Sequence, residues 1–402
     1  MSCDGAGAAV VPSSRIVVGA TLRQHVCEQI YMAIGAARVQ QHLPVAHPIS
    51  LERADFARLR AANYVVGEKS DGVRYTLVLT LHPDDGEPIA LMIDRHFHMF
   101  AVSVFARTSY FSKTTLFDGE LVVAGGAAGA GGCGCKLRYL VFDTMAVAGV
   151  SMMQRTYAER RAEMQRVLEC SLYTAAAGTA APPQPPLSAS AYDFEARRIA
   201  HVDNVVVSGL QTIEFVPKRF YPLADLDIVL RQQREHCSDG LVIVPVDAPI
   251  VLGRASGIFK WKHTHTIDLR VIGGTIPPAP PQTPAPANFT YLDGTFNNGT
   301  TSGAANESVL TELTPWVFTI DAASAAMAAN SVWEFEIASV GGGGGAVGAI
   351  VLRAVRARTD KDTPNDRDTV VKTLQNVVEA IGEHELIAEL TTRHPAFEAR
   401  SL

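Results

Sequence analysis

Residues 68–74 read Glu-Lys-Ser-Asp-Gly-Val-Arg, and this stretch puts a lysine at the end of a strand-like run. The apolar residues Tyr64, Val65 and Val66 precede it, and Asp-Gly is a strong turn signal, so Lys69 is predicted to stand where a strand gives way to a turn. An amine there can be partly desolvated and can act as a nucleophile. A surface hairpin turn with a solvated lysine gives the same letters, so this motif alone leaves both interpretations open.

Length and composition indicate a soluble globular chain of two or three domains, with 402 residues, 47% hydrophobic and 19% charged. No apolar run reaches the roughly 18 residues that span a bilayer. Residues 1–14 are expected to be a disordered tail without the features of a secretory signal or transit peptide. Six scattered cysteines fit a reducing compartment. The net charge of -6 argues against coating duplex nucleic acid by charge alone, and a local basic cleft stays open.

Short β-rich runs alternate with turns between residues 61 and 123 and predict a strongly twisted antiparallel sheet. The predicted strands cover residues 75–80, 89–93, 115–123 and 137–142, with the Gly/Ala-rich segment 125–134 as a flexible hairpin loop. Helices are predicted over 153–169 and about 225–236, and a buried strand over 241–246. The Pro/Ala/Ser-rich stretch 174–190 is expected to be an insertion.

The composition changes after residue 272 to a Pro-rich run, 277–286, and then to polar residues until about 308. This segment predicts a long loop within a second, smaller β domain, which continues through strands at 332–337 and 349–356 and a hairpin at 341–345. Apolar residues at helical spacing predict one amphipathic helix over 366–390.

Charged residues follow several other predicted strands in the same way as Lys69. Lys260 and Lys262 alternate with Trp261, which would put both amines on one face of a strand. The electric field of these two amines is expected to lower the pKa of Lys69 and to stabilise the negative charge on a phosphate group during its transfer. The carboxylates of Glu120 and Asp239 suit a hard divalent cation.

These motifs, taken in order, resemble the covalent nucleotidyltransferase superfamily, which includes mRNA capping enzymes, ATP-dependent DNA ligases and RNA ligases. The segments that carry the resemblance are Lys69-Ser70-Asp71-Gly72-Val73-Arg74, Phe117-Asp118-Gly119-Glu120, Asp239-Gly240-Leu241-Val242 and Lys260-Trp261-Lys262. It covers about residues 49–369.

Within that superfamily the later motifs are similar to those of capping guanylyltransferases. Ligases typically have Glu-Gly where this chain has Asp239-Gly240, and Lys-Trp-Lys followed by Thr-Ile-Asp is capping-like. The most specific discriminator is Arg358-Thr359-Asp360-Lys361, which is similar to a capping-enzyme motif of the second domain. His263 departs from the pattern, because a proline is common there.

The resemblance implies an α+β fold: a nucleotidyltransferase domain with twisted antiparallel sheets plus a β-barrel OB-fold lid domain. The expected boundaries are 15–262 for the first domain, 263–365 for the OB-fold domain with its Pro-rich insertion, and 366–402 for a C-terminal helix that packs back on the first domain.

The resemblance also implies a mechanism, in which Lys69 attacks the α-phosphate of GTP and becomes a lysyl-N-GMP. The implied GTP-binding set is Arg74, Arg95, Glu120, Phe142, Lys218, Asp239, Lys260, Lys262, Asp268, Arg358, Asp360 and Lys361. A divalent cation, Mg²⁺ or Mn²⁺, is the implied cofactor, with Glu120 and Asp239 as its ligands.

Individual roles follow from the same resemblance. The two arginines of the first domain, Arg74 and Arg95, would hold the ribose and phosphates, Phe142 would stack on guanine, and Lys218 would read its O6. Glu120 would contact the ribose or metal, Asp239 the metal, and the lysine pair the α-phosphate, with Asp268 closing that motif. Arg358, Asp360 and Lys361 would orient the departing pyrophosphate.

The implied partners are GTP and a diphosphate-ended RNA, with a separate RNA triphosphatase and cap methyltransferase, since the sequence has no signature of either activity. No membrane is expected as a partner. The resemblance places the protein in the nucleus if the gene is cellular, or in the host nucleus or a cytoplasmic factory if it is viral. The alternatives are an ATP-dependent polynucleotide ligase and a catalytically inactive RNA-binding scaffold.

Overall fold

The computed structural model describes residues 19–40, 42–102, 104–124, 136–170, 172–174, 196–197, 213–271, 292–293, 317–321, 330–341, 349–358, 361 and 363–391. The chain divides into two compact units, one of residues 1–50, 56–261 and 387–402 and one of residues 51–55 and 262–386. The predicted tail at 1–14, the loop at 125–134, most of the insertion at 174–190, the Pro-rich run and most of the 341–345 hairpin lie outside the described residues. Within those ranges, no helix has the length and apolar character to cross a membrane.

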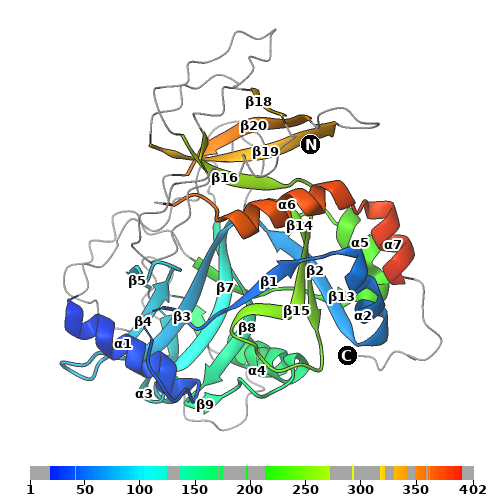
Figure 1. The fold of residues 1–402 in the computed structure, drawn as a ribbon. Helices are drawn as coiled ribbons and strands as arrows, with labels where there is room; N and C mark the ends of the chain where they lie inside the picture. The colour runs from blue at the N-terminus through cyan, green and yellow to red at the C-terminus, as the bar shows by residue number, and fades with distance from the viewer. Residues whose placement is uncertain are drawn as a thin grey trace, which may run out of the picture. The chain divides into compact units, whose positions relative to one another are not determined.

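The first unit is built on a seven-stranded sheet (Figure 1). Its strands in spatial order are β12 (Ile213–Pro217), β8 (Lys136–Val147), β7 (Thr115–Ala124), β3 (Val73–Leu81), β4 (Pro88–Ile93) and β5 (Met99–Ala101), with β9 (Val150–Ser151) paired to β8. The pairs are antiparallel except for β12, which runs parallel to β8. The predicted mixed α+β architecture with antiparallel sheets is confirmed at this level.

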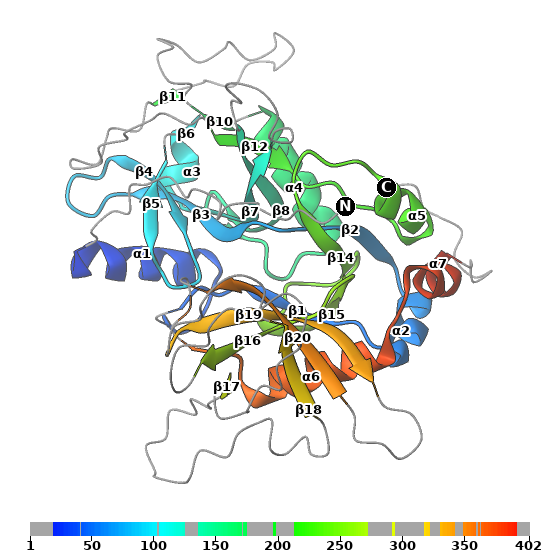
Figure 2. The ribbon, with the colours of Figure 1, turned by 90° about the horizontal axis from the view of Figure 1, so that it is seen from above.

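Both faces of this sheet are covered, because its strands alternate apolar side chains to opposite sides. On β3, Leu77 faces one core and Val78 the other. Figure 2 shows α1 (Ala20–Ala33) on one side of the sheet and α3 (Thr108–Ser112) with α4 (Tyr157–Cys170) on the other. The sequence reasoning missed α1, although Val26 and Ile30, four residues apart, are both fully buried.

A second sheet of the first unit has five strands. In spatial order they are β1 (Ala46–Ser50), β15 (Gly253–Lys262), β14 (Ser238–Pro245), β2 (Tyr64–Ser70) and β13 (Tyr221–Pro222). A short three-stranded sheet consists of β10 (Leu172–Thr174), β6 (Val104–Arg107) and β11 (Ala196–Arg197). Three short helical segments of the first unit are α2 (Phe56–Ala61), η2 (Leu223–Asp225) and α5 (Leu226–Arg231), while η1 (Arg53–Asp55) belongs to the second unit.

The chain passes between the two large sheets twice, over very few residues. Asp71 and Gly72 join β2 of the five-stranded sheet to β3 of the seven-stranded sheet. Residues 218–220 join β12 of the seven-stranded sheet to β13 of the five-stranded one. Both passages carry residues of the predicted site, so the two sheets meet where Lys69 and Lys218 lie.

The second unit contains a five-stranded sheet in the order β17 (Leu292–Asp293), β16 (Thr266–Val271), β19 (Val332–Gly341), β20 (Ala349–Ala357) and β18 (Val317–Asp321). The pairs are antiparallel except for β18, which runs parallel to β20. The OB-fold expected here stays a prediction, because residues 272–291, 294–316 and 322–329 lie outside the described part of the chain.

Three helix predictions need correction. The single helix over 366–390 is wrong: α6 (Arg367–Glu379) and α7 (Glu383–Thr391) are separate, since Ala380 adopts the left-handed conformation that ends a helix. Helix α4 begins at Tyr157 rather than 153, because Thr156 and Glu159 form a capping box, in which each side chain bonds the other residue's backbone N–H. Helix α5 ends at Arg231 and not at 236.

The Asp71–Gly72 passage has no room for a side chain, which gives a test of the fold. A methyl group on Gly72 would lie 2.8 Å from Val122 Cγ1 and 3.0 Å from Glu120 Cγ, and closer still to the backbone oxygen of Leu121. We expect Gly72→Ala to lower the free energy of unfolding by about 2 kcal/mol or more, because the backbone would have to move. Urea titration of the full chain measures this.

The matched control is Gly257→Ala in β15, where the added methyl would meet its nearest neighbour, Arg58 Nη2, at 3.4 Å. That contact is ordinary, and alanine costs less backbone entropy than glycine on folding. Equal destabilisation by both substitutions would contradict a special constraint at Gly72.

Candidate active site

Lys69 is the central residue of the predicted site, and its amine forms an ion pair with Asp239. The Nζ atom of Lys69 donates to Oδ1 of Asp239 at 2.9 Å, and both side chains are about three-quarters buried. Strand β14 is irregular at this point: Ser238 pairs with Ser70 and Gly240 with Lys69, which leaves Asp239 as an extra residue. Such a bulge redirects a side chain, and here it brings the carboxylate to the lysine.

The charges around Lys69 favour its protonated form. Burial lowers the pKa of Lys69, but the Asp239 carboxylate, assisted by Glu120 and Asp71, more than reverses this, so that the pKa is raised overall. The prediction that neighbouring lysines lower the pKa of this amine is therefore wrong with respect to the protein's own side chains, because the carboxylates near it together outweigh burial and raise its pKa. An attack by Lys69 requires that the field of Asp239 be offset.

Glu120 supplies the second carboxylate near Lys69. It projects from β7 of the other sheet, and its Oε1 accepts from the backbone N–H of Gly72 at 3.3 Å. Burial raises the pKa of Glu120, while Lys218, Lys69 and the Gly72 N–H act to lower it. The tight passage at Gly72 thus holds a carboxylate from one sheet against the strand that carries Lys69.

Arg74 is held by β7 and by the start of β1. Its Nε donates to Asp118 Oδ1 at 2.9 Å, a second bond joins Nη2 to Oδ2 of the same carboxylate, and Nη1 donates to Ala46 O at 2.8 Å. This two-pronged geometry fixes the plane of the guanidinium group. Its Cζ lies 5.4 Å from the centroid of the Phe142 ring, so the predicted arginine and the predicted stacking aromatic are neighbours.

Lys218 approaches the same ring from the second passage between the sheets. Its Nζ lies 5.9 Å from the Phe142 centroid and donates to Ser70 Oγ at 2.7 Å. Its backbone N–H donates to Val141 O at 2.7 Å, directly beside Phe142. The structure therefore brings together three residues that the sequence analysis assigned to the nucleotide base and ribose.

Glu68 and His236 also belong to this cluster, and the sequence reasoning missed both. Glu68 Oε1 accepts from Ser70 Oγ at 3.0 Å, lies 3.2 Å from His236 Nε2 and forms an ion pair with Lys218 Nζ at 3.6 Å. Burial acts to raise the pKa of Glu68, but His236, Lys218 and Ser70 lower it to about 2. The available signal was the alternation of Glu68 and Ser70, which puts both on the face of β2 opposite Lys69.

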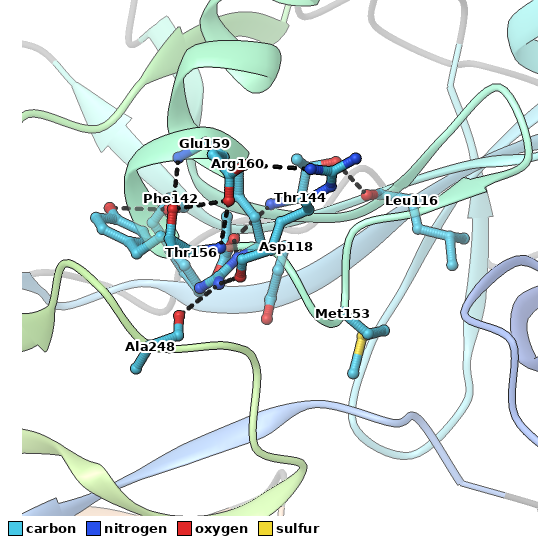
Figure 3. Close-up of polar contacts among 12 residues, drawn as sticks. Leu116, Asp118, Phe142, Thr144, Met153, Thr156, Glu159, Arg160 and Ala248 are labelled. Atoms are coloured by element: carbon cyan, nitrogen blue, oxygen red, sulfur yellow. Dashed lines mark hydrogen bonds and ion pairs between the residues drawn. The ribbon is translucent and has the colours of Figure 1, made fainter.

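Side chains of α4 bond to Phe142 and Asp143 of β8 and hold the backbone there (Figure 3). Tyr157 Oη donates to Phe142 O at 3.2 Å, and Arg160 makes two bonds to Asp143, at 2.7 Å and 2.9 Å. Arg160 Nη1 donates to Ala248 O at 3.0 Å, in the segment between β14 and β15. This buried arginine thereby links β8, which carries Phe142 in the seven-stranded sheet, to a segment that joins two strands of the five-stranded sheet.

Burial and strand register place the predicted lysine pair of β15 and the predicted Arg95. The burial pattern of β15 alternates: Phe259 and Trp261 are buried and Lys260 is half-buried, as the predicted face assignment of Lys260 and Lys262 requires. Arg95 is exposed in the turn after β4, and Ile93 pairs with Thr76, so this turn lies at the Arg74 end of the sheet.

In the second unit, Asp268 joins the two described cations of the predicted lid motif. Arg358 Nη1 donates to both Asp268 oxygens, at 3.0 and 3.1 Å, and Lys361 Nζ forms an ion pair with Oδ2. Glu334 lies 3.7 Å from Arg358 and pairs more closely with Arg356. The third predicted residue of this motif, Asp360, lies outside the described residues.

A divalent cation is implied by the resemblance, and the donors present can be tested against it. Among the residues that the structure describes, no group of three or more His, Cys, Asp or Glu side chains could hold a metal ion. Two carboxylates, Glu120 and Asp239, act on the same amine. Mg²⁺ is usually bound by one or two carboxylates together with substrate phosphates, so this pair fits such an ion.

The fold is of the mixed α+β class. Its candidate site combines a mostly buried lysine, an aromatic ring and paired charges at the junction of two sheets. Comparison with known proteins identifies the family: residues 10–206 match the model of the mRNA capping enzyme, catalytic domain. This segment belongs to that family. Lys218, Asp239 and Lys260 lie beyond the matched residues.

The curated relatives that this chain matches include mRNA-capping enzyme subunits. The chain is 25% identical over 268 residues to the mRNA-capping enzyme subunit alpha of Saccharomyces cerevisiae, covering 62% of this chain and 51% of that protein. For the Schizosaccharomyces pombe subunit alpha the identity is 27% over 238 residues, 56% of this chain and 52% of that protein. The chain thus spans about half the length of the curated relatives that it matches.

Solved structures that resemble this chain include DNA ligases. A mycobacterial DNA ligase D complexed with ATP and MES aligns with a TM-score of 0.38 and 13% identity, covering 78% of this chain and 95% of that chain. The ATP-dependent DNA ligase from bacteriophage T7, in complex with ATP, gives 0.35 and 12%, covering 77% and 98%. These scores are too low to support a conclusion.

The Arg160–Asp143 pair gives the prediction for this site. We expect Arg160→Ala to lower the free energy of unfolding by about 3 kcal/mol or more, because it leaves a buried carboxylate without its partner. The control is Arg166→Ala on the same helix, which breaks an exposed pair with Glu163 and should cost about 1 kcal/mol or less. Urea unfolding of both variants tests this, and similar losses would contradict the role of the buried pair.

Proposed function

We propose that this protein is an mRNA 5′ guanylyltransferase, which transfers GMP from GTP through a lysyl-N-GMP intermediate to a diphosphate RNA end. The observation that carries the proposal is the placement of Lys69: its amine lies against Asp239 at the junction where Arg74, Lys218 and Phe142 also meet. The family match over residues 10–206 supports the same reaction class.

In the first half-reaction, the lone pair of the Lys69 amine attacks the α-phosphorus of GTP. A P–N bond forms, the bond from the α-phosphorus to the bridging oxygen breaks, and pyrophosphate leaves while the nitrogen loses its proton to solvent. In the second half-reaction, a terminal oxygen of the diphosphate RNA end attacks the same phosphorus. The P–N bond breaks, Lys69 regains a proton, and a GpppN end results.

The side chains of the proposed nucleotide site have separable tasks in this scheme. Phe142 stacks on the base, Lys218 donates to it, and Arg74 holds the ribose and phosphates. Lys260 and Lys262 contact the α-phosphate, and Arg95 assists Arg74. Glu120 and Asp239 would hold a divalent cation, Mg²⁺ or Mn²⁺, which would supply positive charge against the carboxylate field on Lys69 and beside the phosphate oxygens.

The second unit is proposed to be an OB-fold lid. Arg358, Asp360 and Lys361 orient the departing pyrophosphate, and Asp268 holds the two cations of this motif until a phosphate competes for them. The support is the Arg358–Asp268–Lys361 cluster, in which both described cations converge on one carboxylate. A separate RNA triphosphatase would supply the diphosphate RNA end, and a separate methyltransferase would complete the cap.

Labelling distinguishes this function from its alternatives. We expect α-labelled GTP with Mg²⁺ or Mn²⁺ to leave label on the protein through denaturing electrophoresis, since the phosphoramidate is covalent. Lys69→Ala should abolish the label, while the exposed-lysine control Lys113→Ala should keep it. Label from ATP alone would indicate a polynucleotide ligase, and no label from either nucleotide would favour an inactive scaffold. Undiminished label on Lys69→Ala would refute the nucleophile.

The proposed lid residue makes a second prediction about the two half-reactions. We expect Arg358→Ala to slow adduct formation from GTP at least tenfold while changing transfer from a preformed adduct to RNA much less, because pyrophosphate is present only in the first step. Arg353→Ala, which breaks an exposed pair with Glu336, is the control and should leave both rates near wild type. An equal loss in both steps would count against the role given to Arg358.

A further inference from the structure

A buried hydrogen-bonded network lies under the Lys218 amine. The Lys218 Nζ donates to Ser70 Oγ, and the Ser70 hydroxyl in turn donates to Glu68 Oε1. Because the carboxylate can only accept, the His236 ring donates to the same oxygen through Nε2. The side chains of Lys218, Glu68 and His236 are 4%, 13% and 13% exposed, so this network is shielded from water.

The network has a direct electrostatic effect on Lys218. A buried ammonium group is costly unless an opposite charge lies nearby, and the Glu68 carboxylate lies 3.6 Å away. The low pKa of Glu68 means that this carboxylate keeps its negative charge at neutral pH. All three of its described contacts converge on Oε1, the oxygen on the Lys218 side, and Oε2 has no hydrogen-bond partner within the described residues.

The protonation state of a lysine decides what it can recognise. An ammonium group only donates hydrogen bonds, whereas a neutral amine can also accept them. A purine with an oxygen at position 6 presents an acceptor there, and a purine with an amino group presents a donor. Only the ammonium form therefore distinguishes the two, because a donor facing a donor leaves both groups unpaired in a desolvated site.

We propose that Glu68 is a specificity-determining positioning residue: through Ser70 and by its charge it holds the Lys218 amine as a fixed ammonium donor beside Phe142, so that the site selects 6-oxopurine over 6-aminopurine nucleotides. His236 supports Glu68 in this task. The inference rests on the proposed function for the position of the base, and it adds residues that make no contact with the nucleotide themselves.

The test compares GTP with 2,6-diaminopurine riboside triphosphate, which has an amino group at position 6 in place of the oxygen and the accompanying N1 proton. Both the rate of adduct formation and the dissociation constant are measured for each nucleotide. Glu68→Gln keeps the shape and an acceptor for Ser70 but removes the charge. We expect the wild-type preference for GTP to fall at least tenfold, with adduct still formed from GTP.

The matched control is Glu163→Gln, a carboxylate-to-amide change at an exposed pair on α4, which should leave the preference unchanged. His236→Gln, which removes one partner of Glu68 and leaves the charge, should reduce the preference in the same direction but less. If Glu68→Gln does not fold, as judged by its unfolding transition, His236→Gln decides the question.

Two outcomes would overturn the inference. One is a Glu68→Gln protein that loses rate or affinity equally for both nucleotides, since that describes a structural role only. The other is an unchanged preference in a folded His236→Gln protein when Glu68→Gln cannot be obtained. Wild-type protein that binds GTP over the diamino analogue but forms no adduct would refute the proposed function and leave the inference standing, so the two failures are distinguishable.

Discussion

The constraint on which the site depends is that three cations at the junction of the two sheets each have their own carboxylate. The pairs are Lys69 with Asp239, Lys218 with Glu68, and Arg74 with Asp118. A charge taken out of water without a partner would cost several kcal/mol, so these positive groups could not be concentrated in one place without matching acids. Charge pairing, rather than a surplus of positive charge, is what allows a chain with a net charge of -6 to gather three cations in one place.

Backbone geometry decides which carboxylate meets which cation. Lys69 and Glu68 are neighbours in sequence and project from opposite faces of β2, so one strand delivers a cation to one side and an anion to the other. The bulge at Asp239 brings a carboxylate to Lys69. The passage at Gly72 brings Glu120 of the seven-stranded sheet close to the same amine. The two crossings between sheets therefore set the electrostatics as well as the fold.

The strands and the position of Lys69 could be predicted because they depend on local signals: period-2 burial, turn residues and short apolar runs. Two errors were also local and avoidable. The Thr156–Glu159 capping box marks the start of α4, and Gly382 follows the left-handed Ala380 at the break between α6 and α7.

The protonation of Lys69 could not be predicted, because it depends on pairings across more than a hundred residues. From the sequence, Lys260 and Lys262 are the visible neighbours by motif, while the distance between Lys69 and Asp239 is visible only in the fold. In the structure, burial and Asp239 act in opposite directions on the same amine, and the carboxylate prevails. The reactivity of Lys69 thus depends on the position of the Asp239 carboxylate. The bulge in β14 sets that position, so an irregularity of one strand controls the chemistry of a lysine on another.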